Sequence, residues 1–135
     1  MAPTQVLLDT SFILSLVKQH RDPWAEVKTV IPGKARVQTL DLVKYELEHL
    51  ARTGPSTTAA WARTSLELMS KRNHVIVEHK PGPSNVDAAL MAHALAEREV
   101  TTIATVDREM RRVMKANGIP AIWPKARHGL LSSGF

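Results

Sequence analysis

Four acidic residues stand where a fold could gather them around a divalent cation: Asp9, Glu46, Asp87 and Asp107. Carboxylates that lie close together repel one another unless a positive charge sits among them. The chain has no cysteine and no paired histidines, and oxygen-only ligands favour Mg²⁺ or Mn²⁺ over zinc. Such an ion can activate water and stabilise charge at a phosphorus atom. The four acids therefore predict metal-dependent hydrolysis of phosphate esters.

Helix capping competes with metal binding as an explanation of the three aspartates. Asp87 stands three residues after Ser84, the spacing of a capping box, and Asp107 could cap the helix that follows it. Asp9 is harder to explain as a cap, because its neighbours are apolar and the hydroxyl residues after it could cap without burying a charge. For Asp87 and Asp107 both explanations stay open.

Glu46 belongs to a predicted helix that runs from residue 40 to about residue 52. The apolar stripe of this helix consists of Leu40, Val43, Leu47 and Leu50. With Leu47 at the centre of the inner face, Glu46 lies about 100° away, at the border of the stripe. From there it can reach a site beside the core. A solvated surface glutamate is the alternative.

Strands and helices alternate along the sequence. Apolar runs predict five strands, at residues 6–8, near 37, and at 74–77, 101–104 and 121–123. Helical spacing predicts helices at about 12–17, 22–30, 40–52, 56–72, 84–98 and 107–117. Because parallel strands need crossovers, we expect a three-layer α/β/α sandwich with a central, mostly parallel sheet of about five strands. The aspartates then fall at the carboxyl ends of the strands, where ligands bind in such folds.

The composition is that of one compact domain. A chain of 135 residues fits a single domain over residues 1–135, with a basic C-terminal tail from about residue 124. The absence of cysteine excludes disulfides and thiolate metal sites and favours a cytoplasmic protein. No apolar run approaches the roughly 18–20 residues of a membrane span, so we expect no membrane partner.

Positive charge is concentrated near the C-terminus. The net charge is +5, and residues 108–135 hold six basic residues and one acid, whereas the two signs balance over residues 1–107. The basic residues of the predicted last helix share one face beside Asp107, an arrangement suited to a phosphate backbone. The candidate polyanion-binding residues are Arg108, Arg111, Arg112, Lys115, Lys125 and Arg127. The solvated outer face of an amphipathic helix is the alternative.

Other site types find less support. No histidine pair has the spacing of a zinc site, and no glycine-rich phosphate loop is present. A phosphatase with a nucleophilic aspartate stays open, although Ser11 stands where the second acid of a DxD pair would be. The tryptophans Trp24, Trp61 and Trp123 are expected in the core or at an interface, since aromatic residues are few and show no clustering with arginines.

In order and spacing, the four acids resemble the motifs of the PIN-domain nucleases. Asp9-Thr10-Ser11 after an apolar strand resembles the first acidic motif of the family, and Glu46 stands at the place of its second-helix acid. Asn85-Val86-Asp87 resembles the third motif and Thr105-Val106-Asp107 the fourth. Val106 departs from the family, which often has asparagine there. The resemblance covers nearly the whole chain.

The resemblance implies an endoribonuclease that uses Mg²⁺ or Mn²⁺ and leaves 3′-hydroxyl and 5′-phosphate ends on RNA. Asp9, Asp87 and Asp107 would bind metal, and Glu46 would bind metal or orient water. Ser11 and Thr105 would hydrogen-bond to the carboxylates, or act as local caps instead. The basic helix and tail would contact the RNA backbone.

The biological role has three candidates. The basic tail is similar to that of PIN proteins that process ribosomal RNA, so ribosomal RNA maturation is the first. A toxin-type ribonuclease that cuts tRNA or mRNA is the second, and a non-catalytic RNA-binding protein is the third. A homodimer, an antitoxin and a ribosome-assembly protein are the partners that the resemblance leaves open.

Overall fold

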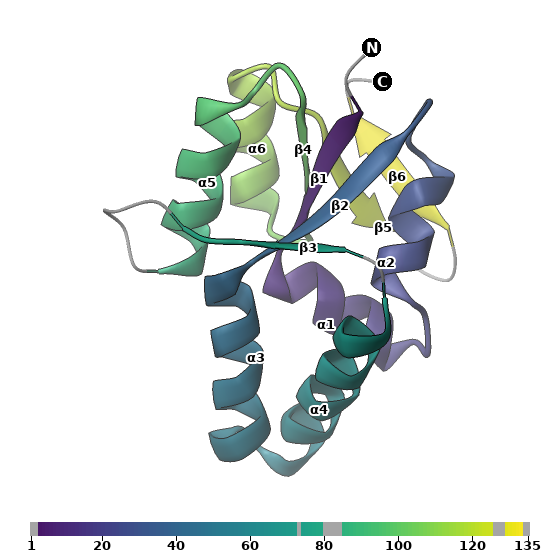
Figure 1. The fold of residues 1–135 in the computed structure, drawn as a ribbon, viewed down its shortest axis with the longest axis vertical. Helices are drawn as coiled ribbons and strands as arrows, with labels where there is room; N and C mark the ends of the chain where they lie inside the picture. Colours follow the sequence, from purple (N-terminus) through teal and green to yellow (C-terminus); the bar gives the residue numbers. More distant parts are fainter. Residues whose placement is uncertain (1–2, 73, 80–84, 126–128, 134–135) are drawn as a thin grey trace.

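A computed structural model describes residues 3–72, 74–79, 85–125 and 129–133 of the protein. It contains a six-stranded sheet in the order β3-β2-β1-β4-β5-β6 (Figure 1). The strands are β1 (Thr4–Leu8), β2 (Ala35–Leu40), β3 (Val75–Val77), β4 (Thr101–Ala104), β5 (Ala121–Pro124) and β6 (Leu130–Ser133). Strands β1 to β5 are parallel, and β6 runs antiparallel to β5. We call the two ends of the parallel strands the carboxyl end and the amino end of the sheet.

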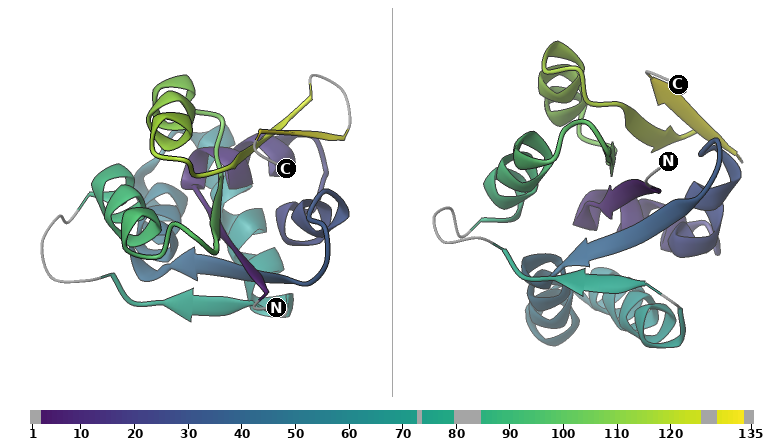
Figure 2. Two further views of the ribbon diagram at one scale, coloured as in Figure 1. Left: turned by 90° about the horizontal axis from the view of Figure 1, so that it is seen from above. Right: turned by 45° about the horizontal axis from the view of Figure 1, so that its top comes forward.

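Helices cover both faces of this sheet. They are α1 (Thr10–Lys18), α2 (Pro23–Glu26), the 3₁₀ turn η1 (Val27–Thr29), α3 (Asp41–Thr53), α4 (Ser56–Lys71), α5 (Val86–Ala96) and α6 (Arg108–Ala116). Figures 1 and 2 show α5 and α6 side by side on one flank, α2 on the other, and α3 packed against α4 beyond the carboxyl ends of β2 and β1. The predicted three-layer α/β class is confirmed.

The core lies between the central strands and the helices. Val6, Leu7 and Leu8 of β1 are fully buried, and every residue of β4 is buried, as expected for parallel strands covered on both faces. Phe12 and Ile13 of α1 complete this core directly after Asp9. Within the described residues, no helix is both long and apolar enough to cross a membrane.

Two segments differ from the predicted elements. The predicted helix over residues 22–30 is only the four-residue α2, capped by Asp22, followed by the turn η1. The β-branched residues Val27, Thr29 and Val30 disfavour a longer helix there. Residues 130–133 form a sixth strand that the sequence did not predict, and Arg21 donates a hydrogen bond to the carbonyl of Gly129 next to it (2.9 Å).

The sheet register sets the positions of the acids. Leu8 of β1 is paired with Ala104 of β4, so the two strands end side by side. The backbone N–H of Asp9 donates to the carbonyl of Ala104 (2.9 Å). The residues that follow these strands, Asp9 and Thr105, therefore meet at the carboxyl end of the sheet.

Candidate metal and RNA site

Asp9 is held by two hydroxyl groups rather than by a helix cap. It occupies the N-cap position of α1, but its side chain makes no capping hydrogen bond to that helix. Its Oδ2 atom instead accepts hydrogen bonds from the hydroxyls of Ser11 (2.8 Å) and Thr105 (2.7 Å). Asp9 is only 3% exposed. Residues that follow β1 and β4, Ser11 and Thr105, thus hold the buried carboxylate of Asp9 in place.

The environment of Asp9 opposes its ionisation. Burial raises the pKa of Asp9, and the negative charge of Glu46 raises it further, whereas the hydrogen bonds from Thr105 and Ser11 act in the opposite direction. The net effect is a raised pKa. A cation next to Asp9 would offset both the burial and the repulsion.

Asp107 caps α6, so the capping alternative is correct for this residue. Its Oδ1 atom accepts hydrogen bonds from the backbone N–H groups of Glu109 (2.9 Å) and Met110 (3.2 Å). Its own backbone N–H donates to the Thr105 hydroxyl (3.1 Å), the same hydroxyl that donates to Asp9. Thr105 therefore couples the position of Asp107 to that of Asp9. Capping uses one carboxylate oxygen and leaves the other for a ligand.

Asp87 does not cap its helix. Asn85 is the N-cap of α5, and its side chain accepts a hydrogen bond from the backbone N–H of Ala88 (2.8 Å). Ser84, the other member of the predicted capping box, lies outside the described residues. Burial raises the pKa of Asp87, and the charges of Asp9 and Asp107 raise it further. Asp87 therefore lies within electrostatic reach of both other aspartates.

The four acids border one hollow of about 370 Å³ at the carboxyl end of the sheet. Its lining residues are Asp9, Thr10, Ser11, Leu14, Glu46, Leu50, Asp87 and Asp107. Glu46 is exposed on α3 and also borders a neighbouring hollow of about 430 Å³ between α3 and α5, together with Asp87. The structure thus brings together all four acids that the sequence singled out.

The donor chemistry of this hollow fits Mg²⁺ or Mn²⁺. All four acidic side chains present carboxylate oxygens, and burial together with the neighbouring acids raises the pKa values of Asp9 and Asp87. Among the described side chains, no three acids or histidines lie close enough to chelate one ion as they stand.

The basic residues beside this hollow are arranged less uniformly than the sequence predicted. Arg111 stacks on Trp123, with its guanidinium carbon 4.4 Å from the ring centroid. This contact corrects the expectation that the tryptophans stay apart from the arginines. Arg112 pairs with Glu109 one turn earlier on α6. Both arginines thus have partners within the protein.

Three of the other four basic candidates are exposed, and the fourth lies outside the described residues. The side chains of Arg108, Lys115 and Lys125 are exposed, and none of them forms an ion pair with another described residue. Arg127 lies outside the described residues. Arg108 directly follows Asp107, so it is the base best placed to hold a phosphate next to the acids.

Comparison with known proteins agrees with this geometry. Residues 6–127 match the family described as PIN like domain. The chain belongs to this family. It is similar to Ribonuclease VapC4 of Methanocaldococcus jannaschii, with 24% identity over 118 residues that cover 87% of this chain and 88% of that protein. The resemblance drawn from the four acidic motifs is confirmed.

A solved structure shares the fold of this PIN-like domain. It is the PIN domain endonuclease Utp24, with a TM-score of 0.76 and 21% sequence identity. The similarity covers 98% of this chain and 93% of that chain. At this level of identity the likeness concerns the arrangement of the backbone.

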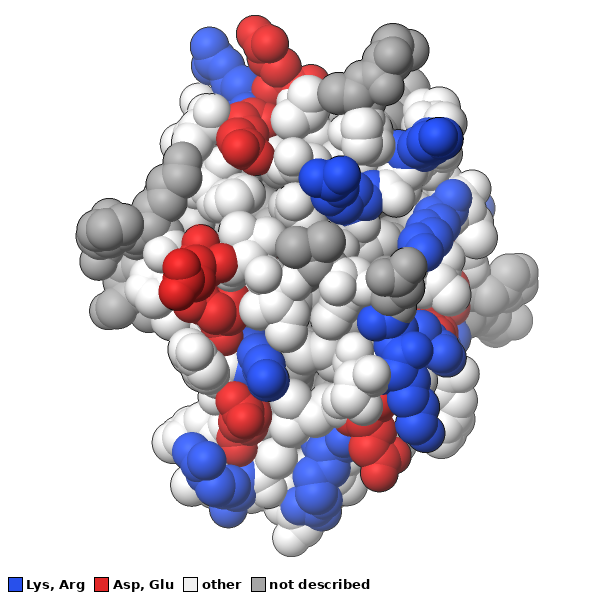
Figure 3. All heavy atoms as spheres, viewed as in Figure 1, with Lys and Arg blue, Asp and Glu red and all other residues white. Residues whose placement is uncertain are grey.

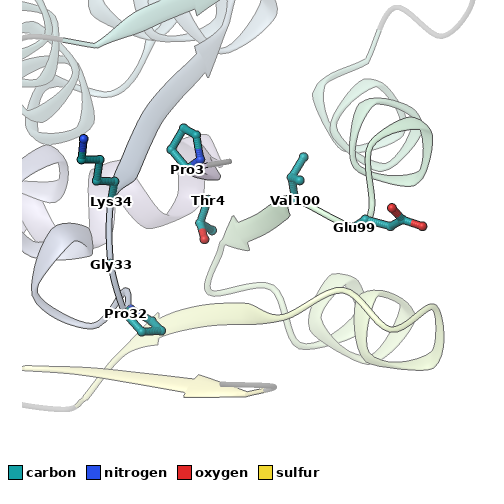
Figure 4. A pocket seen from close by; sticks show the side chains of 7 residues that line it. All are labelled: Pro3, Thr4, Pro32, Gly33, Lys34, Glu99 and Val100. Carbon is teal, nitrogen blue, oxygen red and sulfur yellow. The ribbon is translucent and has the colours of Figure 1, made fainter. Parts of the chain in front are cut away.

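A hollow larger than the acidic one lies away from the acids. It has a volume of about 550 Å³ and lies at the amino end of the sheet (Figure 4). Its lining residues are Pro3, Thr4, Pro32, Gly33, Lys34, Glu99 and Val100. One acid and one base face it, without a second carboxylate to share a cation. Choosing between these two hollows by size would therefore point to the end of the sheet opposite the four acids.

Sequence reasoning missed two features at the acidic end of this PIN-like domain. The hydroxyl of Thr10 is buried in the wall of the acidic hollow and has no hydrogen-bond partner among the described residues. Asp41 and His79 lie in contact after the ends of β2 and β3, with Nδ1 of His79 3.0 Å from Oδ1 of Asp41. No local spacing indicates that pair, because its members are 38 residues apart in the chain.

Proposed function

We propose that this PIN-like domain is a metal-dependent endoribonuclease that hydrolyses RNA phosphodiester bonds. The observation that carries the proposal is the convergence of four carboxylates from four separate elements on one hollow. Family membership supports it, as do the names of two similar proteins, a ribonuclease and an endonuclease. The exposed bases beside the hollow would attract a polyanion to it.

Each acid has a distinct part in this proposal. Asp9, Asp87 and Asp107 would hold Mg²⁺ or Mn²⁺, and Glu46 would serve as a further ligand or orient the attacking water. The bound ion supplies Lewis acidity for activating water and neutralising charge on the scissile phosphate. Ser11 and Thr105 keep Oδ2 of Asp9 in place, so that the carboxylate can turn its other oxygen toward the hollow. Because Glu46 is exposed, its side chain can change position when RNA enters the hollow.

The phosphate backbone would lie along the start of α6. Arg108 lies one residue from Asp107, and Lys115 lies two turns further on the same helix. Lys125 follows β5 at the same end of the sheet. Within this activity, ribosomal RNA maturation is our first candidate role, because bases on α6 and after β5 suit a long, structured RNA. Cleavage of tRNA or mRNA, as by a toxin-type ribonuclease, is the second.

The decisive experiment is cleavage of a labelled, structured RNA in Mn²⁺, Mg²⁺ or EDTA. We expect wild-type protein to cut with either metal and to be inactive in EDTA. Asp87→Asn should lose cleavage and keep RNA binding, because it removes a ligand without changing the basic residues. The matched control is Glu99→Gln, which removes one negative charge at the amino end of the sheet and should cut normally.

Two results would contradict the proposal. Cleavage that continues in EDTA would exclude a metal-dependent reaction. RNA binding without cleavage in any metal, for ribosomal RNA, tRNA and mRNA alike, would identify a non-catalytic RNA-binding protein. Comparing these three RNA classes also separates the two candidate roles.

A further inference from the structure

A threonine that borders the acidic hollow has a hydroxyl group without a hydrogen-bond partner. Thr10 lines this hollow and directly follows Asp9 in the chain. The residue is only 4% exposed, and its Oγ1 atom is buried and forms no hydrogen bond within the described part of the chain. Neither bulk water nor a described side chain or backbone group therefore satisfies this hydroxyl.

The place of Thr10 in its helix explains why the hydroxyl has no acceptor. In the interior of a helix, a threonine hydroxyl can bond to the carbonyl group three or four residues earlier. Thr10 is the first residue of α1, so the residues at those positions are Leu7 and Val6 of strand β1. Their backbone is extended rather than helical. The helix itself thus offers Thr10 no carbonyl group to bond.

The two other hydroxyl groups next to Asp9 are already in use. Those of Ser11 and Thr105 both donate to Oδ2 of Asp9, at 2.8 and 2.7 Å. Thr10 makes no such bond, although it adjoins Asp9 and lines the same hollow. Ser11 and Thr105 therefore hold the carboxylate, whereas the hydroxyl of Thr10 is available to a group that enters the hollow.

The location of Thr10 separates it from other buried polar side chains that lack a partner among the described residues. Gln5, Gln38 and His74 have such atoms, and none of these three residues lines the acidic hollow. Of the described residues, Thr10 alone combines a buried, unpartnered polar atom with a place in that wall. In a native fold, such an atom indicates a water molecule or an ion that binds next to it.

A hydrated cation in the hollow would supply the missing partner. Mg²⁺ loses its water molecules reluctantly and usually keeps several of them when carboxylates bind it. These water molecules can donate hydrogen bonds to a hydroxyl oxygen. A threonine side chain populates two χ1 rotamers in a helix, so a turn about the Cα–Cβ bond of Thr10 can direct its hydroxyl toward the hollow.

We propose that Thr10 is a positioning residue for the divalent cation, because its hydroxyl accepts a hydrogen bond from a water molecule of the hydrated ion that the four acids hold. This inference rests on the proposed metal-dependent function and adds a residue to that site. Thr10 needs no direct contact with the ion or with RNA. In the metal-free protein the same hydroxyl is an unsatisfied buried group, so it favours metal binding and opposes metal-free stability.

Replacement of the hydroxyl by a methyl group separates this role from a structural one. Thr10→Val keeps the shape of the side chain and removes the hydroxyl, whereas Thr10→Ser keeps the hydroxyl. The matched control is Thr39→Val in β2. Thr39 is fully buried outside the acidic hollow, and its hydroxyl accepts a hydrogen bond from Nε1 of Trp24 (3.4 Å). The control thus removes a hydroxyl that has a partner in the fold.

The measurements are calorimetric titration of the metal-free, full-length protein with MnCl₂ and thermal unfolding in EDTA. Mn²⁺ serves as the probe because it takes the same oxygen ligands as Mg²⁺. We expect Thr10→Val to weaken Mn²⁺ binding by on the order of tenfold, the effect typical of residues that support metal ligands. In EDTA its melting temperature should equal or exceed that of the wild type, because an unsatisfied buried hydroxyl is removed.

The other two variants are expected to behave differently. Thr10→Ser should bind Mn²⁺ as the wild type does, since the hydroxyl is kept. Thr39→Val should also bind Mn²⁺ normally, but it should melt at a lower temperature, because the indole N–H of Trp24 loses its acceptor.

Four results would overturn the role of Thr10. Equal Mn²⁺ affinity in Thr10→Val and the wild type would show that the hydroxyl has no influence on the ion. A marked fall in the melting temperature of Thr10→Val in EDTA, or its failure to fold, would make the hydroxyl a structural group. Weakened Mn²⁺ binding in Thr10→Ser as well would assign the effect to the methyl group. A wild-type protein that binds no Mn²⁺ would overturn the proposed metal-dependent function too, whereas the first three results leave that function intact.

Discussion

The hollows at the two ends of the sheet are lined by different charged groups. At the carboxyl end, four acids from separate elements border one hollow of about 370 Å³. At the amino end, the hollow of about 550 Å³ is larger, and a second hollow beside it is lined by Lys28, Lys34, Arg36 and His74. Figure 3 shows several Lys and Arg side chains along the right of one face, with basic and acidic side chains mixed over its lower part. Strand direction, rather than cavity size, locates the candidate site.

The charged residues at the two ends also differ in burial and in the direction of their pKa shifts. At the carboxyl end, burial and the neighbouring acids raise the pKa values of Asp9 and Asp87. At the amino end, burial and the charge of Lys28 lower the pKa of His74, so this ring stays neutral at neutral pH. The bases at the amino end lie on the open surface, where water relieves their repulsion. Of the hollows compared, the one at the carboxyl end brings together acids whose charge a bound cation would neutralise.

The largest expected effect comes from removing the buried acid. Asp9→Asn should reduce RNA cleavage by more than about 100-fold, since even partners of metal ligands contribute about 10- to 100-fold. In EDTA its melting temperature should equal or exceed that of the wild type, because an amide can accept the bonds from Ser11 and Thr105 without a buried charge. A marked fall in melting temperature without metal would instead make Asp9 a structural residue.

A smaller effect is expected from the exposed acid of α3. Glu46→Gln should lower cleavage by roughly 10- to 100-fold, because Glu46 borders the hollow but is not fixed by the hydroxyl pair. Glu48→Gln, two residues along the same helix and outside both hollows of the carboxyl end, should cut as the wild type does. Initial rates at saturating Mn²⁺ provide the measurement. Equal losses in both variants would point to general surface charge.

The salt dependence of RNA binding compares bases at the two ends directly. Arg108→Gln should weaken binding and reduce the slope of log Kd against log salt by about 1, the change expected from one lost phosphate contact. Lys34→Gln at the amino end should leave the slope unchanged. Binding is measured by fluorescence anisotropy with uncleaved RNA in EDTA. Equal slopes in the wild type and Arg108→Gln would remove α6 from the proposed RNA path.

The smallest effect concerns stability against pH in EDTA. Because the pKa of Asp9 is raised in the folded protein, the folded state binds more protons than the unfolded chain above the usual aspartate pKa of about 3.9. The free energy of unfolding contributed by Asp9 therefore falls as pH rises from that value to the raised pKa. Asp41, with a lowered pKa, acts in the opposite direction but is common to both proteins compared.

Urea unfolding of the wild type and Asp9→Asn at several pH values gives the measurement. The stability advantage of Asp9→Asn should grow as pH rises through this window and then level off. A difference that does not change with pH would show that Asp9 ionises in the folded protein as readily as in the unfolded chain.

The fold and the four acids could be predicted because the signals are local. An apolar strand followed by an acid, as at Leu8 and Asp9, places the acid at a strand end once the sheet is known to be parallel. The same holds for Thr105 and Asp107 after β4. The sequence left capping and metal binding open at Asp107, and the structure shows that one oxygen caps α6. A spacing pattern cannot separate roles that one carboxylate can combine.

The features that escaped prediction depend on distant contacts. Asp41 meets His79 only because β2 and β3 pair in one register, which no local pattern specifies. Arg111 has the helical spacing of an outward base, yet Trp123 from β5 attracts its guanidinium. Strand β6 has four residues, too few for a periodic signal. In each case the missing information is which elements become neighbours.

The antiparallel course of β6 has a practical consequence for handling this protein. The chain enters the sheet at Thr4, and β6 turns back so that Ser133, paired with Ala121 at the start of β5, leads away from the acids. Thr4 and Ser133 therefore both lie at the amino end of the sheet. Strand β1 has five residues, so roughly 16 Å separates its beginning from Asp9. A fluorophore, a surface tether or a fused protein joined before Thr4 or after Ser133 would therefore be attached at the end of the sheet opposite the four acids.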